Sequence, residues 1–167
     1  MIAVIDYGAG NLFSVCNALN YLNLDYVVTK DAQEIKDADG IILPGVGAFR
    51  DAMQKLTATG LVDTLKKEAE KKPFLGVCLG LQMLFEEGHE FGVTQGLGLL
   101  PGKVRALDSH GQKLPHIGWN TAHINHACPL TEGIEDESYV YYVHSFCAET
   151  EDRYIALSTT YGETFPG

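Results

Sequence analysis

Short strand-like runs alternate with segments of helical periodicity along the first half of the chain. Apolar residues recur at three- and four-residue spacing from Leu12 to Leu22, as they do on one face of a helix. Residues 48–72 also predict helix, in two pieces divided near residues 59–60, and residues 79–87 predict another. The runs between these helices are short, apolar and bounded by glycine, proline or polar residues: 2–5, 26–29, 41–43 and 74–77. This alternation predicts an α/β fold with a mostly parallel sheet covered by helices on both faces.

The second half of the chain has a different pattern. Residues 88–102 are rich in glycine and predict a long loop. β-type segments then dominate, at residues 104–107, 116–119, 139–143 and 154–157. They predict antiparallel β hairpins added to the α/β body. No repeat or linker-like tract interrupts the sequence, so we expect residues 1–167 to form a single domain.

Charge and cysteine usage limit the classes of partner and compartment. Twelve Lys and Arg residues against twenty-two Asp and Glu residues give a formal net charge of -10, which argues against a nucleic-acid partner. No stretch reaches the roughly 18 consecutive apolar residues of a membrane span, and no signal peptide precedes the first strand-like run, so we expect no membrane partner. The four cysteines form no CxxC pair, which predicts free thiols in the reducing cytoplasm.

Three glycine-containing turns follow predicted parallel strands. They lie at residues 8–11, 45–47 and 76–80. Ligands of such sheets bind beyond the carboxyl ends of the strands. The pattern therefore predicts that the chemistry is gathered at one edge of the sheet.

The sequence Gly-Val-Cys-Leu-Gly at 76–80 has the form of a nucleophile elbow. The nucleophile of an elbow sits on a strained strand-to-helix turn, and its neighbours two residues away must lack side chains that would clash. The start of the following helix favours a thiolate at Cys78 and places the N–H of Leu79 near a developing oxyanion. The alternative interpretation is a buried structural cysteine with glycines that only help the helix to pack.

The sequence Pro-Gly-Val-Gly at 44–47 follows another predicted strand. Two glycines allow backbone N–H groups to approach a ligand closely, although a plain tight turn explains them as well. Acyl transfer needs a second donor loop beside its nucleophile, and this loop is the candidate.

These motifs resemble those of the triad-type (class I) glutamine amidotransferases. The resemblance rests on Gly-Val-Cys-Leu-Gly-Leu-Gln at 76–82 and Leu-Pro-Gly-Val-Gly at 43–47. Three further segments narrow it to the glutaminase subunits of imidazole glycerol phosphate synthase, an enzyme of histidine biosynthesis: Asp-Tyr-Gly-Ala-Gly-Asn-Leu at 6–12, Pro-His-Ile-Gly-Trp-Asn at 115–120 and Tyr-Tyr-Val-His-Ser-Phe at 141–146. The resemblance covers essentially the whole chain.

The resemblance implies a mechanism and a set of site residues. Cys78 is expected to attack the side-chain amide of glutamine and to form a glutamyl thioester, from which ammonia and then glutamate are released. Val46 and Leu79 are expected to supply the N–H groups of the oxyanion hole. The residues expected to hold glutamine are Gly45, Gln82, His144, Ser145 and Phe146. No cofactor is implied.

The resemblance also implies a partner, a cyclase subunit with a (β/α)₈ barrel that receives the ammonia in a heterodimer. The phosphorylated substrate belongs to that partner, which agrees with the acidic composition of this chain. The resemblance places Asn11 and its turn against the partner. Trp119 and Tyr141 are expected to face it too, because exposed aromatic side chains anchor interfaces. Core packing is the alternative for the two aromatic residues.

The sequence departs from the family in one respect. The family completes its triad with a late His-Pro-Glu motif, and the 167 residues contain none. We therefore expect a C-terminally truncated domain that lacks about one strand and one helix. Loss of a triad member costs several orders of magnitude in rate, so the activity of this chain is in doubt.

Two other functions stay open on the sequence. The first is a catalytically silent docking subunit, and the second is a free-standing cysteine hydrolase of the same fold. Gln82 and the segment 141–146 argue against the hydrolase, because both indicate glutamine binding. The cluster of His123, His126 and Cys128 has no evident fourth ligand, so we expect no metal site.

Overall fold

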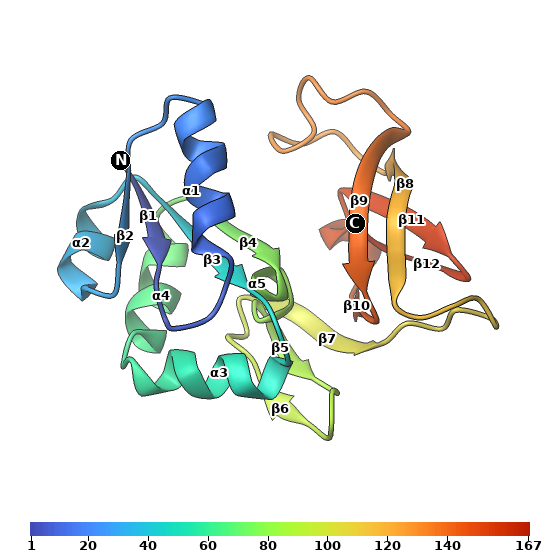
Figure 1. Ribbon diagram of the computed structural model, residues 1–167, viewed down its shortest axis with the longest axis horizontal. Helices are drawn as coiled ribbons and strands as arrows, with labels where there is room; N and C mark the ends of the chain where they lie inside the picture. Colours follow the sequence, from blue (N-terminus) through green and yellow to red (C-terminus); the bar gives the residue numbers. More distant parts are fainter. The chain divides into compact units, whose positions relative to one another are not determined.

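The computed structural model describes residues 1–167, which form two compact units, Met1–Leu100 and Pro101–Gly167 (Figure 1). None of the helices has the length and apolar character that crossing a membrane requires. The expectation of one domain over residues 1–167 stays a prediction.

The first unit contains a four-stranded parallel sheet in the order β2-β1-β3-β4. The strands are β1 (Ile2–Ile5), β2 (Tyr26–Thr29), β3 (Gly40–Gly45) and β4 (Phe74–Cys78). All four lie where the apolar runs predict them, so the α/β class and the parallel sheet are confirmed. β4 is an edge strand, and its side chains Leu75 and Val77 are exposed.

Helices accompany the sheet: α1 (Leu12–Tyr21), α2 (Ala32–Asp37), α3 (Phe49–Ala58) and α4 (Val62–Ala69). Leu19 of α1 packs with Val4 and Ile42 on one face of the sheet. Successive strand residues point to opposite faces, and Ile5 and Leu43 on the other face are fully buried as well. Both faces are therefore covered.

Two predictions in this unit are wrong. The helix expected over 79–87 is a single turn, α5 (Leu79–Gln82), and residues 85–88 form strand β5 (Phe85–Gly88), which pairs with β6 (Thr94–Gln95). Three consecutive residues, Met83, Leu84 and Phe85, are buried. A helix lying on a sheet buries only one stripe of its residues, so burial of all three favours an extended chain. The long loop expected over 88–102 is correspondingly interrupted by β6 and by the start of β7.

The second unit is an antiparallel assembly. Strands β7 (Leu100–Ala106) and β10 (Phe146–Glu149) pair with each other, and a four-stranded sheet has the order β12-β11-β8-β9. Its strands are β8 (His116–Ile124), β9 (Ser138–His144), β11 (Leu157–Tyr161) and β12 (Glu163–Pro166). The expected antiparallel pairing is confirmed for β8–β9, and β11–β12 is a second hairpin at residues that the sequence analysis did not predict. The strand expected at 154–157 is wrong, because a 3₁₀ turn (Asp152–Tyr154) precedes β11 and leaves Tyr154 exposed.

Candidate active site

Cys78 stands at the junction of β4 and α5 with a strained backbone. Its φ of 56° and ψ of -120° lie in a region that residues with a side chain rarely adopt. The thiol is exposed, whereas Cys147 is buried and Cys16 and Cys128 are half-buried. A strained, exposed residue between a strand and a helix is the geometry of a nucleophile elbow. The helix that follows is one turn long, so its dipole is smaller than the sequence led us to expect.

Three glycines around Cys78 allow the backbone segments to approach closely. A Cβ atom on Gly80 would lie 1.9 Å from the carbonyl oxygen of Leu43, and one on Gly76 would lie 2.5 Å from the backbone of Leu81. A Cβ atom on Gly45 would lie 2.4 Å from the backbone nitrogen of Gly80. No side chain fits at these positions, so the end of β3 and the start of α5 are in direct backbone contact.

The loop at residues 44–47 lies beside the elbow. In the parallel pairing of β3 with β4, Gly45 is the partner of Cys78. Val46 follows with a half-exposed side chain, and Gly47 has a φ of 91° that favours glycine. The structure therefore brings the proposed nucleophile and the proposed second donor loop together.

Two side chains that the sequence did not single out hold this loop. The hydroxyl of Tyr7 donates to the carbonyl oxygen of Pro44 at 2.8 Å. A carboxylate oxygen of Glu90 accepts from the backbone N–H of Phe49, the first residue of α3, at 2.8 Å. Burial raises the pKa of Tyr7 to about 12, so its hydroxyl remains a proton donor at neutral pH. Tyr7 belongs to the motif at 6–12, but nothing local in the sequence indicates its partner.

The other residue expected to hold glutamine in the first unit is Gln82. It is the last residue of α5 and is half-buried. Gln82 therefore lies one helical turn after Cys78. Its role in binding glutamine stays a prediction.

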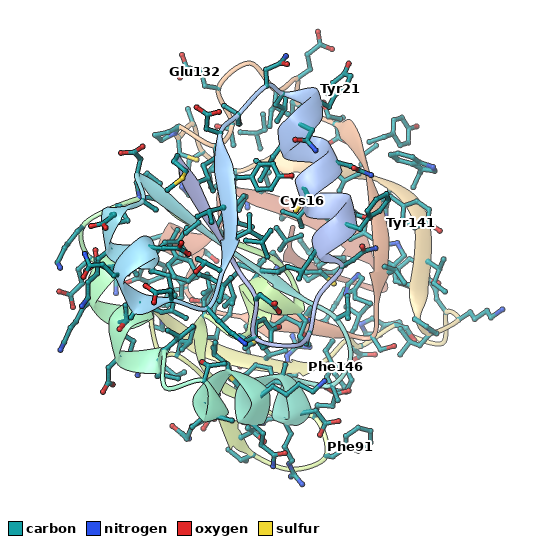
Figure 2. All side chains as sticks on the ribbon, turned by 60° about the vertical axis from the view of Figure 1, so that its left-hand side comes forward. Cys16, Tyr21, Phe91, Glu132, Tyr141 and Phe146 are labelled. Carbon is teal, nitrogen blue, oxygen red and sulfur yellow. The ribbon has the colours of Figure 1, made fainter.

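His144, Ser145 and Phe146 lie in the second unit, at the corner between β9 and β10 (Phe146 is labelled in Figure 2). One ring nitrogen of His144, Nδ1, lies 3.0 Å from the carbonyl oxygen of Phe146. The other, Nε2, lies 2.9 Å from Nδ1 of His116. A carbonyl oxygen only accepts, so in the neutral pair His144 donates to Phe146 and accepts from His116. Both ring nitrogens are engaged, which leaves His144 poorly suited to serve as a general base.

The two histidines lie in an aromatic cluster that keeps them neutral. The ring of His116 stacks on Tyr161 at a centroid distance of 4.0 Å and on Tyr142 at 5.0 Å. Burial lowers the pKa of His116, with a smaller contribution from His144, and burial also lowers the pKa of His144. The two consecutive hydrogen bonds from His116 through His144 to the Phe146 carbonyl therefore fix the backbone between β9 and β10, in the segment that is expected to bind glutamine.

The residues expected at the partner interface are exposed. Trp119 and Tyr141 are cross-strand partners in β8 and β9, with ring centroids 5.5 Å apart in an edge-to-face contact (Tyr141 is labelled in Figure 2). Ile117 and Val143 pair beside them, and each of the four side chains is more than half exposed. These residues form an apolar face on β8–β9, so core packing within this chain does not explain the two aromatic residues. Asn11 is exposed too, and its side chain caps α1 by accepting from the N–H of Ser14 at 3.1 Å.

His123 and Cys128, two members of the cluster noted in the sequence, contact different partners in the structure. His123 forms ion pairs with Asp136 at 3.1 Å and Glu137 at 3.5 Å, and all three side chains are exposed. Cys128 lies instead against Thr131, whose hydroxyl accepts from its N–H. The exposed group of His123 and two acidic residues is explained as surface ion pairing.

Comparison with known proteins shows the family. Residues 3–165 match the glutamine amidotransferase class-I family. An imidazole glycerol phosphate synthase subunit HisH from Bacillus cereus is 48% identical over 168 residues, covering 100% of this chain and 80% of the relative. A subunit HisH from Listeria monocytogenes is 47% identical over 169 residues, covering 100% of this chain and 81% of the relative.

Solved structures support the fold. A glutamine amidotransferase aligns with a TM-score of 0.71 at 15% identity, covering 91% of this chain and 76% of that chain. A chain of PurLQS from Thermotoga maritima aligns with a TM-score of 0.69 at 21% identity, covering 97% and 76%. At these identities the likeness concerns the fold, whereas the sequence matches concern the family. The chain therefore belongs to the class-I glutamine amidotransferases and, within them, to the HisH subunits of imidazole glycerol phosphate synthase.

Proposed function

We propose that this protein is the glutaminase subunit of an imidazole glycerol phosphate synthase and that it supplies ammonia to a cyclase partner in histidine biosynthesis. The family match and the names of the relatives support this assignment. The observation that carries the glutaminase activity is the strained, exposed Cys78 at the β4–α5 turn, paired in register with Gly45 of the neighbouring loop.

In the proposed reaction, the thiolate of Cys78 attacks the side-chain carbonyl carbon of glutamine. A C–S bond forms and the carbonyl electron pair moves onto oxygen, where the N–H groups of Val46 and Leu79 stabilise the charge. When the pair returns, the C–N bond breaks and ammonia leaves with a proton from a general acid. Water then attacks the thioester, glutamate is released and the thiol is restored.

Gly45, Gln82, His144, Ser145 and Phe146 are proposed to bind glutamine. The arrangement at the β9–β10 corner supports the last three, because the hydrogen bonds of His144 fix the backbone of that segment. A fixed backbone binds a ligand at a smaller entropic cost than a mobile one.

The proposed mechanism assigns no general base to this chain. The 167 residues contain no His-Pro-Glu motif, and the hydrogen bonds of His144 argue against a substitute role. The gene sequence downstream of codon 167 tests whether a His-Pro-Glu motif follows. A docking subunit without glutaminase activity of its own is the second candidate function, because both ring nitrogens of His144 are engaged and neither is free to act as a base.

The apolar face on β8–β9 is proposed to bind the cyclase partner, which we propose to be a (β/α)₈ barrel. Four large exposed side chains, Ile117, Trp119, Tyr141 and Val143, make a contiguous apolar surface of the kind that marks protein interfaces. Asn11, at the start of α1, is proposed as a further partner contact. The free thiols suit the reducing cytoplasm that we propose as the location.

Selective labelling of Cys78 tests the proposal. A diazo-ketone analogue of glutamine should modify Cys78, and excess glutamine should prevent the modification. Cys147 should stay unlabelled, because it is buried and burial raises the pKa of its thiol to about 11. Labelling of Cys16 or Cys128 in place of Cys78 would overturn the assignment of the nucleophile.

Cys78→Ala separates the candidate functions when it is assayed in the complex with the cyclase. The variant should lose glutamine-dependent synthesis and keep synthesis from added ammonia, whereas Cys128→Ser, the matched control, should keep both. A wild-type complex that uses only added ammonia would indicate the silent docking subunit. Full glutamine hydrolysis without any partner would indicate a free-standing hydrolase.

A further inference from the structure

Tyr7 connects the two backbone segments that carry the proposed oxyanion-hole donors. It lies in the turn after β1, is 4% exposed, and donates its hydroxyl hydrogen to the Pro44 carbonyl at 2.8 Å. The same hydroxyl oxygen lies 3.7 Å from the sulfur of Met83, which directly follows α5 and is fully buried. Pro44 precedes Val46 by two residues, and Met83 follows Leu79 by four.

The ring of Pro44 packs closely against the turn that carries Tyr7. A Cβ atom on Gly10, in the same turn as Tyr7, would lie 2.9 Å from Cβ of Pro44. The turn therefore lies directly against the proline ring, while Tyr7 binds the carbonyl of the same residue. On the opposite side, Gly45 is in backbone contact with Gly80 of α5.

The far end of the loop is held separately. Glu90 accepts from the N–H of Phe49, so the chain is fixed at Pro44 and again at Phe49. Between the two anchors lie residues 45–48, of which two are glycines. Glycine-containing segments change backbone direction at small cost, so the direction of the peptides between the anchors depends on how firmly each anchor is held.

We propose that Tyr7 is a positioning residue for glutamine hydrolysis: its hydroxyl fixes the Pro44 carbonyl and so holds the N–H of Val46 in place relative to α5. This inference rests on the proposed function, because it concerns the donors assigned there. Tyr7 does not touch the reacting atoms. Its effect is on the oxyanion, which exists during hydrolysis and not in the bound substrate.

Tyr7→Phe isolates the hydroxyl. It keeps the ring and its packing and leaves the buried Pro44 carbonyl without its donor. Because a misdirected donor acts on the transition state, kcat for glutamine hydrolysis in the complex with the cyclase should fall about 10- to 100-fold, while KM for glutamine changes by less than about threefold. Tyr26→Phe is the matched control, since Tyr26 is a half-buried tyrosine that begins β2, at the end of the sheet away from the loop.

A second measurement separates positioning from general damage. Alkylation of Cys78 by iodoacetamide forms no oxyanion, so its rate should be the same in the wild type and in Tyr7→Phe. Inhibition by a glutamine-derived aldehyde forms a tetrahedral oxyanion and should weaken by about the same factor as kcat. Equal losses in alkylation and hydrolysis would indicate a disordered site and would overturn the proposal.

Hydrogen exchange tests the anchor without glutamine turnover. The amides of residues 45–49 should exchange about tenfold faster in Tyr7→Phe than in the wild type or Tyr26→Phe. Unchanged exchange, or an unchanged kcat, would overturn the role of Tyr7. Faster exchange in a complex whose wild type hydrolyses no glutamine would instead overturn the proposed function and leave the anchor standing.

If Tyr7→Phe does not fold, Gly10→Ala carries the same test. Its added methyl group would press on Pro44, and the φ of 105° at Gly10 would strain the turn that carries Tyr7, while Tyr7 itself is intact. In this variant too, kcat for glutamine hydrolysis should fall while the rate of alkylation of Cys78 by iodoacetamide stays the same. Wild-type kcat in this folded variant would count against the proposal.

Discussion

Gly80→Ala should displace the turn that carries Cys78. The added Cβ atom would lie 1.9 Å from the carbonyl oxygen of Leu43, and Cβ atoms essentially never approach closer than 3.0 Å. The neighbours are backbone atoms of β3, at the centre of a packed unit, so they cannot rotate away. The start of α5 must therefore move by about 1 Å before the contact becomes tolerable.

Two effects of this substitution oppose each other. Alanine is the better helix former by about 1 kcal/mol, but α5 is a single turn in which propensity counts for little. Overpacking of a filled site costs about 1–3 kcal/mol, so the clash should win and the variant should be less stable by about 1–2 kcal/mol. A shift of about 1 Å at the nucleophile should also lower kcat by roughly 100-fold.

Gly40→Ala is the matched control, because Gly40 begins the same strand β3 and its added Cβ atom would make an ordinary contact of 3.5 Å with the carbonyl oxygen of Pro73. Its stability should stay within about 0.5 kcal/mol of the wild type. The measurements are the urea midpoint by circular dichroism and glutamine hydrolysis in the complex. A Gly80→Ala protein with the stability and activity of Gly40→Ala would refute the reasoning from close backbone contact.

Three further outcomes are expected. Burial lowers the pKa of His116 and His144 below 6.5, so the unfolded chain binds protons there that the folded chain does not; stability should fall as the pH drops from 7 to 5, and a flat unfolding midpoint would contradict this. Hydrogen bonding from Arg105 lowers the pKa of Glu163 from 4.5 to about 2, so the stability it adds is present above pH 4.5 and lost toward pH 2. Glu163→Gln should cost roughly 1–2 kcal/mol at pH 7 and remove that part of the pH dependence, and identical acid titrations of unfolding for both proteins would exclude it. Leu75 is exposed on the edge strand β4, so residues 1–167 should self-associate in sedimentation experiments and Leu75→Lys should reduce this; a wild-type monomer at all concentrations would argue otherwise.

Local patterns predicted those features that depend on neighbouring residues in the chain. The four parallel strands are short apolar runs. The predicted 48–72 helix is divided at Gly60 into α3, which ends before it, and α4, which begins after it. The elbow was recognisable because its chemistry is contained in five consecutive residues. The short helix α2 was missed, since it buries only Ile35 and has no repeating apolar face, although Asp31 caps it with hydrogen bonds of 2.7 and 3.1 Å.

The errors arose where burial was decided by contacts distant in sequence. The helix expected over 79–87 fails after one turn because Met83, Leu84 and Phe85 are all buried. No periodicity distinguishes such a run from a helix, since the pattern does not record which faces are covered.

By itself, the sequence determined the α/β class and the family, and it predicted Cys78 as the nucleophile, because each is encoded in short motifs with a fixed order. Only the tertiary structure decided which contacts the residues of those motifs make with distant parts of the chain. It showed that Gly80 has no side chain because the carbonyl of Leu43 occupies the space, and that Tyr7 holds Pro44 across 37 positions of the chain. Such contacts join residues that no local pattern relates, and they exist only once the parallel strands have brought the turns after β1, β3 and β4 to one edge of the sheet.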